Sequence, residues 1–246
     1  HKIPGSRYTS AEFFAQEWQQ MWCKTWLLLG RCDEVKQPGD FQIEEIGPES
    51  FIIMRQADDT IKVFYNVCQH RGARLLFNAQ GHADAITCPY HGWRYRNDGS
   101  LQWVRDAEDF PQGDPCGKVS LQQVKSDVFA GFVWINMDDN SCSLREYLGP
   151  ICGDWESYQV DHWPRKMALT ARMPCNWKVI QDNFHESYHL HDVHPQTEAA
   201  LEQSYKHTRF DLSEEGHNRM IMRGDTPSRS LQEKNVELLQ PGLQAL

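Results

Sequence analysis

The chain has 246 residues, of which 24% are charged, and a formal net charge of −9 at pH 7. This length is enough to bury one large core or two modest ones. The acidic balance, without a basic patch, argues against a nucleic-acid partner, and no stretch approaches the ~20 apolar residues that cross a membrane.

The eight cysteines are scattered without a disulfide framework, and the chain shows no signal-peptide pattern. We therefore expect a cytoplasmic protein in which the thiols that bind no metal are free and mostly buried. Because the first residue is His1 rather than Met, we also expect that a few residues are missing at the front.

The N-terminal segment predicts a helix. Thr9 and Glu12 have the spacing of a capping box. A stripe of apolar residues then follows at helical spacing and is typical of core packing. It consists of Phe14, Trp18, Met21 and Trp22.

Short strands separated by turn signals come next along the chain. We expect strands at residues 41–46, 51–55, 61–67 and 129–136, with turns at 38–39, 47–48, 58–59 and 98–99. This pattern predicts a small antiparallel β domain over roughly residues 35–150.

The remainder of the chain favours helices with one strand. A helix begins at Leu144 and ends at residues 149–150, and residues 167–172 predict a strand. Asn176 is the expected N-cap of a long helix from Trp177 to about His191, which Pro195 closes. A weak helical stripe follows at residues 236–239.

Two short pairs of metal-ligating residues lie in the first half of the chain. Cys68 and His70 form the first pair, and Cys88 and His91 form the second. One Cys and one His from each of two loops suit a [2Fe-2S] cluster in which one iron binds both thiolates and the other binds both imidazoles.

The glycines around these pairs support a cluster over a zinc site. Gly72 and Gly92 follow the ligand histidines where a side chain would crowd the sulfides. Zinc also uses Cys2His2 sets, but its usual spacing has two or more residues within the first pair, whereas Cys68 and His70 are separated by one. A structural zinc site and unrelated core residues are the weaker alternatives.

A second constellation lies near the end of the predicted long helix. Glu186 and His189 are three residues apart and share one helix face. His194 can fold back toward His189 if the residues before Pro195 break the helix. Two histidines and one carboxylate on one face form the iron site of non-haem Fe(II) oxygenases. Taken alone, these histidines could equally be exposed or capping residues.

Read together, the segments CQHRG, CPYHGW and NWKVIQDNFHESYHLHDVHP resemble the Rieske non-haem iron oxygenases, the α subunits of ring-hydroxylating oxygenases. The resemblance implies an α+β fold in which a small antiparallel β Rieske [2Fe-2S] domain is inserted in a helix-grip, START-like catalytic domain. The expected parts are an N-terminal helical part (1–34), the Rieske domain (35–154) and the N-terminal portion of a catalytic domain (155–246), which we expect to be truncated.

The resemblance also implies roles for individual residues. It assigns His189 and His194 to mononuclear Fe(II), and Glu186 to an electron-transfer bridge between His189 and the cluster histidine, matching His91, of a neighbouring subunit. The family works as a homotrimer of α subunits, with or without a β subunit. Asn183 lies one turn before these residues and is a candidate either to contact the ligands of the iron or only to pack.

The third iron ligand is not identified. In the family this carboxylate lies much further along the chain than residue 246. Asp211 and Asp225 are available here, but neither has the expected context.

The implied reaction is O2 activation, with hydroxylation or dihydroxylation of a small organic, aromatic or alicyclic substrate. The chain has no G-x-G-x-x-G motif after a strand, so electrons from NAD(P)H must arrive through a separate ferredoxin or flavin reductase. The alternatives are a Rieske-type electron-transfer protein without oxygen chemistry and a zinc-stabilised interaction module. Hydroxylation, cis-dihydroxylation and demethylation stay open.

Overall fold

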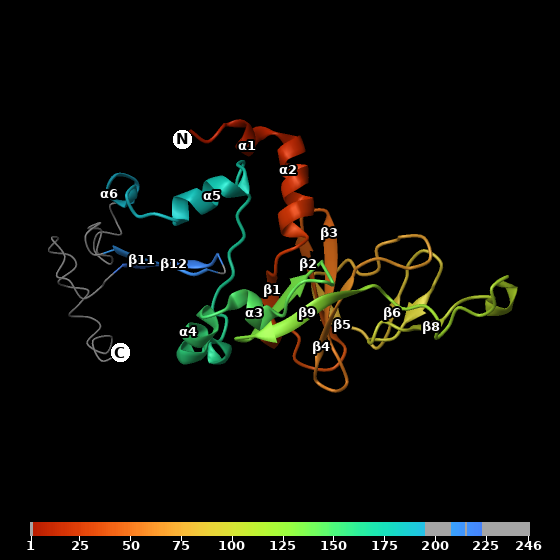
Figure 1. The fold of residues 1–246 in the computed structure, drawn as a ribbon. Coiled ribbons are helices and arrows are strands. Elements are labelled where there is room, and N and C mark those ends of the chain that lie inside the picture. Colours follow the sequence, from red (N-terminus) through yellow and green to blue (C-terminus); the bar gives the residue numbers. More distant parts are fainter. Residues whose placement is uncertain (1, 195–207, 215, 223–246) are drawn as a thin grey trace. The chain divides into compact units, whose positions relative to one another are not determined.

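The computed structural model describes residues 2–194, 208–214 and 216–222. The chain divides into two compact units, one of residues 11–166 and one that joins residues 1–10 to residues 167–246 (Figure 1). No helix in these described ranges is long and apolar enough to cross a membrane. The stripe predicted at residues 236–239 lies outside the described residues.

A seven-stranded antiparallel sheet forms the centre of the unit 11–166. A second, three-stranded sheet lies toward one end of this unit (Figure 1). In sheet order the large sheet contains β1 (Leu27–Arg31), β10 (Phe132–Asn136), β9 (Gln123–Phe129), β4 (Ile61–Tyr65), β3 (Glu49–Arg55), β2 (Asp40–Ile46) and β5 (Gln80–His82). The small sheet contains β6 (Ile86–Thr87), β7 (Arg94–Tyr95) and β8 (Leu101–Trp103).

Strand β3 explains why the large sheet has a core on each face. Phe51, Ile52, Ile53 and Met54 are all 0% exposed. Because successive side chains of a strand point to opposite faces, Ile52 and Met54 join one apolar cluster while Phe51 and Ile53 join another. The first of these clusters also contains Cys68, so the predicted cluster loop is anchored in the core of the sheet.

Most predicted strands match, with one difference in the last quarter of the unit. The strand predicted at 129–136 is β10, but it begins three residues later, because Ala130 and Gly131 both have positive φ, 53° and 76°, and form the turn between β9 and β10. Strands β5 to β8 were not predicted, since strands of two or three residues carry almost no periodic signal.

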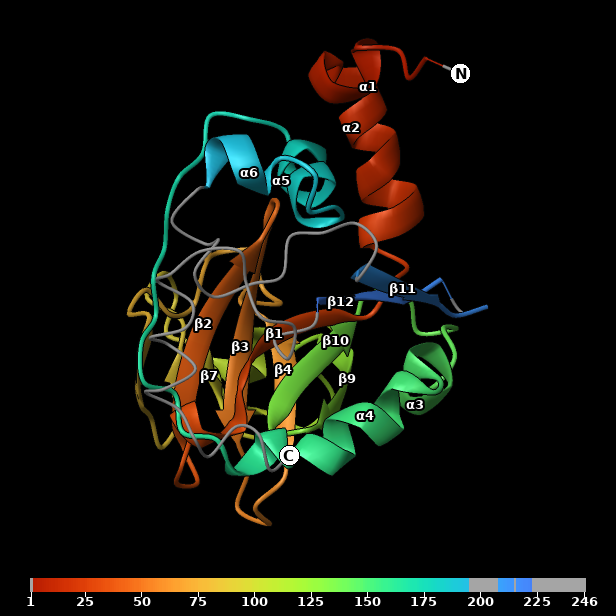
Figure 2. The same ribbon diagram turned by 90° about the vertical axis from the view of Figure 1, so that its left-hand side faces the viewer.

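Two helices cover the β9–β10 side of the sheet (Figure 2). α3 (Leu144–Leu148) begins at Ser143, which forms a capping box with Glu146, and α4 (Ile151–Tyr158) follows directly. Leu144 and Leu148 pack with Trp134 of β10 in a third apolar cluster. The helix predicted from Leu144 is therefore confirmed, whereas α4 was not predicted.

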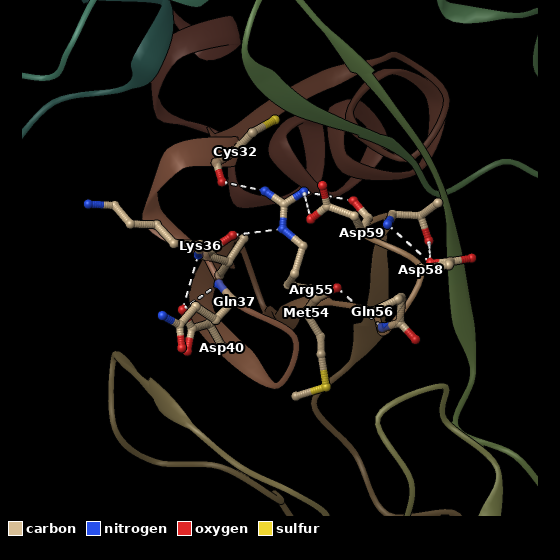
Figure 3. Close-up of polar contacts among 11 residues, drawn as sticks. Cys32, Lys36, Gln37, Asp40, Met54, Arg55, Gln56, Asp58 and Asp59 are labelled. Carbon is tan, nitrogen blue, oxygen red and sulfur yellow. Dashed lines mark hydrogen bonds and ion pairs between the residues drawn. The ribbon is translucent and has the colours of Figure 1, made fainter.

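Arg55 joins two loops of the same unit through its guanidinium group (Figure 3). It donates hydrogen bonds to the carbonyl oxygens of Cys32 at 2.9 Å, Val35 at 2.8 Å and Asp59 at 2.8 Å. Three backbone acceptors around one largely buried cation make this contact structural, because the buried guanidinium needs acceptors for its N–H groups and finds them in the two loops.

The N-terminal helices differ from the prediction. α1 (Ser6–Thr9) ends where the capping box was expected to begin a helix, and α2 (Ala11–Glu17) continues into a π-helical turn at Trp18–Trp22. The Thr9 hydroxyl donates to the Gly5 carbonyl oxygen at 3.3 Å, so it does not act as the predicted N-cap. Phe14, part of the predicted buried stripe, is 43% exposed.

In the unit formed by residues 1–10 and 167–246, the residues that the structure describes form α1, two further helices and a β hairpin. The helices are α5 (Trp177–Phe184) and α6 (Leu190–Val193), and the hairpin pairs β11 (Thr208–Leu212) with β12 (Asn218–Met222). The strand predicted at 167–172 is wrong, because these residues have no regular structure. Asn176 caps α5 as predicted, by accepting from the Lys178 amide, but the helix ends seven residues early.

Short 3-10 turns complete the described elements. They lie at Cys32–Glu34, Ala107–Asp109 and Val160–His162. All eight cysteines are unbonded to one another. Of the six outside the predicted cluster only Cys152 is buried, so the expectation that most of these thiols are buried is wrong.

Candidate functional site

The two predicted cluster loops have the same backbone geometry. In the first, the Cys68 amide donates to the Ala73 carbonyl oxygen at 2.8 Å and the Gly72 amide donates to the Cys68 carbonyl oxygen at 3.0 Å. The second loop repeats both bonds from Cys88, at 2.8 and 3.0 Å, with Gly92 in the equivalent place. Each loop is thus a tight turn closed by its own backbone.

Gly72 and Gly92 are required by backbone conformation. Their φ angles are +73° and +75°, a region that side chains with a Cβ disfavour. A Cβ on Gly72 would meet no described atom within 4 Å, and one on Gly92 would meet only Trp103, at 3.6 Å. The left-handed turn is therefore the reason this structure shows for both glycines, and the expected crowding of the sulfides stays a prediction.

The four predicted cluster ligands form an inner pair and an outer pair. Cys68 and Cys88 are each 2% exposed, and the Cys88 thiol contributes, after burial, to raising the pKa of Cys68. The rings of His70 and His91 lie 4.7 Å apart with an interplanar angle of 71°. Thiols therefore lie inside, next to the core, and imidazoles lie outside.

This arrangement fits two irons better than one zinc ion. Within the part of the chain that the structure describes, no three His, Cys, Asp or Glu side chains converge closely enough to hold a single metal ion. Two thiols as one pair and two imidazoles as another are the donor set of a cluster whose irons have different ligands. The mononuclear zinc alternative needs four donors around one point.

Tyr95 was not predicted to contribute to the site. Its side chain is 0% exposed, and its hydroxyl oxygen lies 3.3 Å from Cys68 Sγ and accepts from the Gln69 amide at 3.1 Å. Burial raises the pKa of Tyr95, and the contact with Cys68 raises it further, so the phenol keeps its proton. In the sequence, the one indication of this role was the position of Tyr95 just after the second ligand loop, in the short strand β7.

Glu186 and His189 are in direct contact in the second unit. Glu186 Oε1 lies 2.5 Å from His189 Nδ1, and Glu186 Oε2 accepts from the backbone amides of Tyr188 and His189. The hydrogen bond with His189 is the main cause that lowers the pKa of Glu186. A carboxylate at Nδ1 fixes the tautomer and leaves Nε2 of His189 for another partner.

His189 and His194 come together as the sequence suggested. Their rings lie 5.4 Å apart with an interplanar angle of 73°. The route differs from the prediction, because His189 is the N-cap of the short helix α6 and His194 is its C-cap. The short helix α6 (Leu190–Val193), which is separate from α5, brings the imidazoles together. We had expected one long helix that is interrupted only before Pro195.

The structure supplies no third ligand for this pair among the residues it describes. Asp211 forms ion pairs through Oδ2 with Arg209 at 2.8 Å and with Arg219 at 2.7 Å, and it is not brought together with the histidine pair. Asp225, the other acidic residue considered, lies outside the described residues.

Asn183 and its neighbour Asp182 are both exposed. Asp182 accepts a hydrogen bond from the Tyr8 hydroxyl at 2.7 Å, which is the main cause that raises the pKa of Tyr8. Among the described residues, Asn183 makes no hydrogen bond or ion pair with His189 or His194. Its role near the iron stays a prediction.

Two family models match the chain. The Rieske [2Fe-2S] domain matches residues 25–123, and the catalytic domain of the ring hydroxylating alpha subunit matches residues 160–242. The first match contains all four predicted cluster ligands, and the second contains Glu186, His189 and His194.

Curated relatives give the same result. The chain is 35% identical over 195 residues to the carnitine monooxygenase oxygenase subunit of Escherichia coli (strain K12), a match that covers 78% of this chain and 52% of the relative. It is 29% identical over 196 residues to the glycine betaine monooxygenase oxygenase subunit of Chromohalobacter salexigens, covering 80% and 44%. It is 34% identical over 195 residues to the chlorobenzene dioxygenase subunit alpha of Cupriavidus sp. (strain PS12), covering 74% and 42%.

Solved structures agree. A crystal structure of the quaternary ammonium Rieske monooxygenase CntA with a bound inhibitor has a TM-score of 0.79 at 30% identity, covering 86% of this chain and 59% of that one. Naphthalene 1,2-dioxygenase with bound indole has a TM-score of 0.65 at 29% identity, covering 76% and 43%. The chain spans about half the length of the curated relatives it matches.

Proposed function

Because the chain belongs to the α subunits of the Rieske non-haem iron oxygenases, we propose that it carries electrons to, and holds part of, the iron site of a terminal oxygenase. The observation that carries this proposal is the meeting of His189 and His194 beside Glu186. A Rieske-type electron carrier has no use for that second group of residues.

Four residues hold the proposed cluster. Cys68 and Cys88 bind one iron and His70 and His91 bind the other, and the group supplies single electrons at a potential of roughly −150 to +300 mV. Burial keeps the thiolates away from solvent, while the outer imidazoles present the cluster to its partners. A ferredoxin or flavin reductase that uses NAD(P)H supplies the electrons.

His189 and His194 hold the proposed mononuclear Fe(II), which supplies open positions for O2. Glu186 orients His189 by holding the proton at Nδ1. In the proposed homotrimer, with or without a β subunit, Glu186 also meets His91 of a neighbouring copy and so joins the two metal sites. A carboxylate outside the described residues completes the iron ligands.

A quaternary ammonium compound is the substrate class that the relatives favour. The compounds in the names of the first relatives, carnitine and glycine betaine, each carry a trimethylammonium group, and they differ from the aromatic or alicyclic compounds that we expected. An aromatic ring is the second candidate, because the match to the chlorobenzene dioxygenase subunit has nearly the same identity as the carnitine match.

Two expectations from the sequence stay predictions. They are the domain limits 1–34, 35–154 and 155–246 and the cytoplasmic location.

Substrate-dependent oxygen uptake tests the proposed activity. The complete gene product, with a surrogate reductase and NADH, is supplied with carnitine, glycine betaine or chlorobenzene, and products are identified by mass. We expect uptake with at least one trimethylammonium compound and an added oxygen atom in the products. Uptake with chlorobenzene alone would favour the second candidate, and cluster reduction without uptake for any compound would favour the pure electron carrier.

Metal analysis separates the oxygenase from its alternatives. We expect iron beyond the two atoms of the cluster, loss of that extra iron in His189→Ala, and no loss in His82→Ala, a histidine in the other unit. We expect Glu186→Gln to keep all the iron but to slow reoxidation of the cluster by O2 and substrate. Zinc in place of iron and sulfide would refute the whole proposal.

A further inference from the structure

Trp93 contacts both ligand loops of the proposed cluster. Its indole ring is nearly parallel to the imidazole of His70, with ring centroids 4.8 Å apart and an interplanar angle of 7°. Its backbone carbonyl accepts from the Cys88 amide at 2.8 Å and closes the second loop. One residue therefore closes the loop that carries Cys88 and supports the ligand of the other loop.

Trp93 is itself held in place. It is 7% exposed and belongs to the apolar cluster under the ligand loops. Phe110, from the segment after β8, lies against it with ring centroids 6.1 Å apart at 60°. Since closely packed aromatic rings cannot rotate freely, the plane of the indole is fixed before any metal binds.

The two histidines differ in this respect. His91 is accompanied by the ring of Tyr90, 3.8 Å away and tilted by 37°, but Tyr90 is 62% exposed and is the adjacent residue in the sequence. His70 is exposed on its own loop, and the buried Trp93 comes from a different loop. Only His70 thus has a rigid aromatic support that is independent of its own loop.

We propose that Trp93 is a positioning residue that sets the ring plane of His70 and couples the geometry of one ligand loop to the other. This rests on the proposed cluster ligands but not on the oxygen chemistry. The electron-rich face of an indole favours the more positive state of a neighbouring group. Trp93 therefore stabilises the oxidised cluster relative to the reduced one, in addition to orienting the imidazole.

Three variants of the full chain test this on the isolated, cluster-loaded protein. Trp93→Leu removes the flat ring, Trp93→Phe keeps a smaller one, and Trp103→Leu removes a 44% exposed indole on the neighbouring strand. We expect changed g-values in the EPR spectrum of the reduced cluster and a more positive reduction potential for Trp93→Leu. Trp93→Phe should recover most of both, and Trp103→Leu should match wild type.

Phe110→Leu covers the case in which Trp93→Leu does not fold. Loosening Trp93 from its outer side should shift the g-values in the same direction by a smaller amount. Wild-type g-values and potential in Trp93→Leu, or in Phe110→Leu where Trp93→Leu does not fold, would overturn the proposal, and so would an equal shift in Trp103→Leu. These readouts need no turnover, so a failure of the proposed oxygenase activity would leave them unaffected.

Discussion

Removing the Tyr95 hydroxyl should lower the reduction potential of the cluster. The Gln69 amide donates to this hydroxyl at 3.1 Å, which leaves the phenolic proton to point at Cys68 Sγ, 3.3 Å away. Reduction adds negative charge to the cluster, so the hydrogen bond is stronger in the reduced state. Hydrogen bonds to charged groups contribute roughly 1.5–3 kcal/mol, and only the difference between the two states shifts the potential.

If that difference is about 1 kcal/mol, the reduction potential of Tyr95→Phe should be lower than that of wild type by about 40 mV. The conversion follows because, for one electron, a factor of ten corresponds to about 1.36 kcal/mol and to about 59 mV. A redox titration followed by circular dichroism of the cluster measures it. Tyr65→Phe is the control, since Tyr65 packs on the opposite face of the large sheet. An unchanged potential in Tyr95→Phe at full cluster content, or an equal decrease in Tyr65→Phe, would refute the reasoning.

Two further predictions concern stability. Gly99→Ala should lower the free energy of unfolding by more than ~2 kcal/mol, because φ is +90° and the new Cβ would lie 2.6 Å from Phe64. Gly117→Ala is the control: φ is +73° but no atom lies near the new Cβ, so the free energy of unfolding should fall by only about 1 kcal/mol. Urea denaturation measures both. The second prediction concerns pH. The hydrogen bond between His82 and Asp40, 3.0 Å long, raises the pKa of His82 above 6.5. The stabilisation of the folded protein by this pair is therefore complete below pH 6.5 and is lost as the pH rises through the raised pKa of His82. Wild type should therefore exceed His82→Asn in stability by more at pH 6 than at pH 9, and a constant or increasing difference would contradict this.

The cluster loops could be predicted from the sequence because their information is local. Within each loop the Cys and His ligands and the glycine with positive φ lie within five residues of one another, and each loop is closed by its own backbone bonds. The contacts of Tyr95 and Trp93 with the first loop were not predictable in this way. They join residues more than twenty positions apart through the small sheet, whose strands are too short to show periodicity.

The end of α5 shows why a helical pattern failed near the iron residues. Helical spacing continues through His189, but the Glu186 carboxylate binds the amides of Tyr188 and His189. A side chain that accepts from nearby amides offers the backbone an alternative to the helix. The predicted strand at 167–172 failed for another reason, since alternation shows that a strand could form but not that a partner strand lies beside it.

The self-closed ligand turns have a consequence for the order in which the protein is assembled. Their shape is set by amide–carbonyl bonds and by the sheet beneath them, so folding does not have to wait for iron. We therefore expect that a preassembled [2Fe-2S] cluster can be inserted after folding, into loops whose backbone conformation is already set.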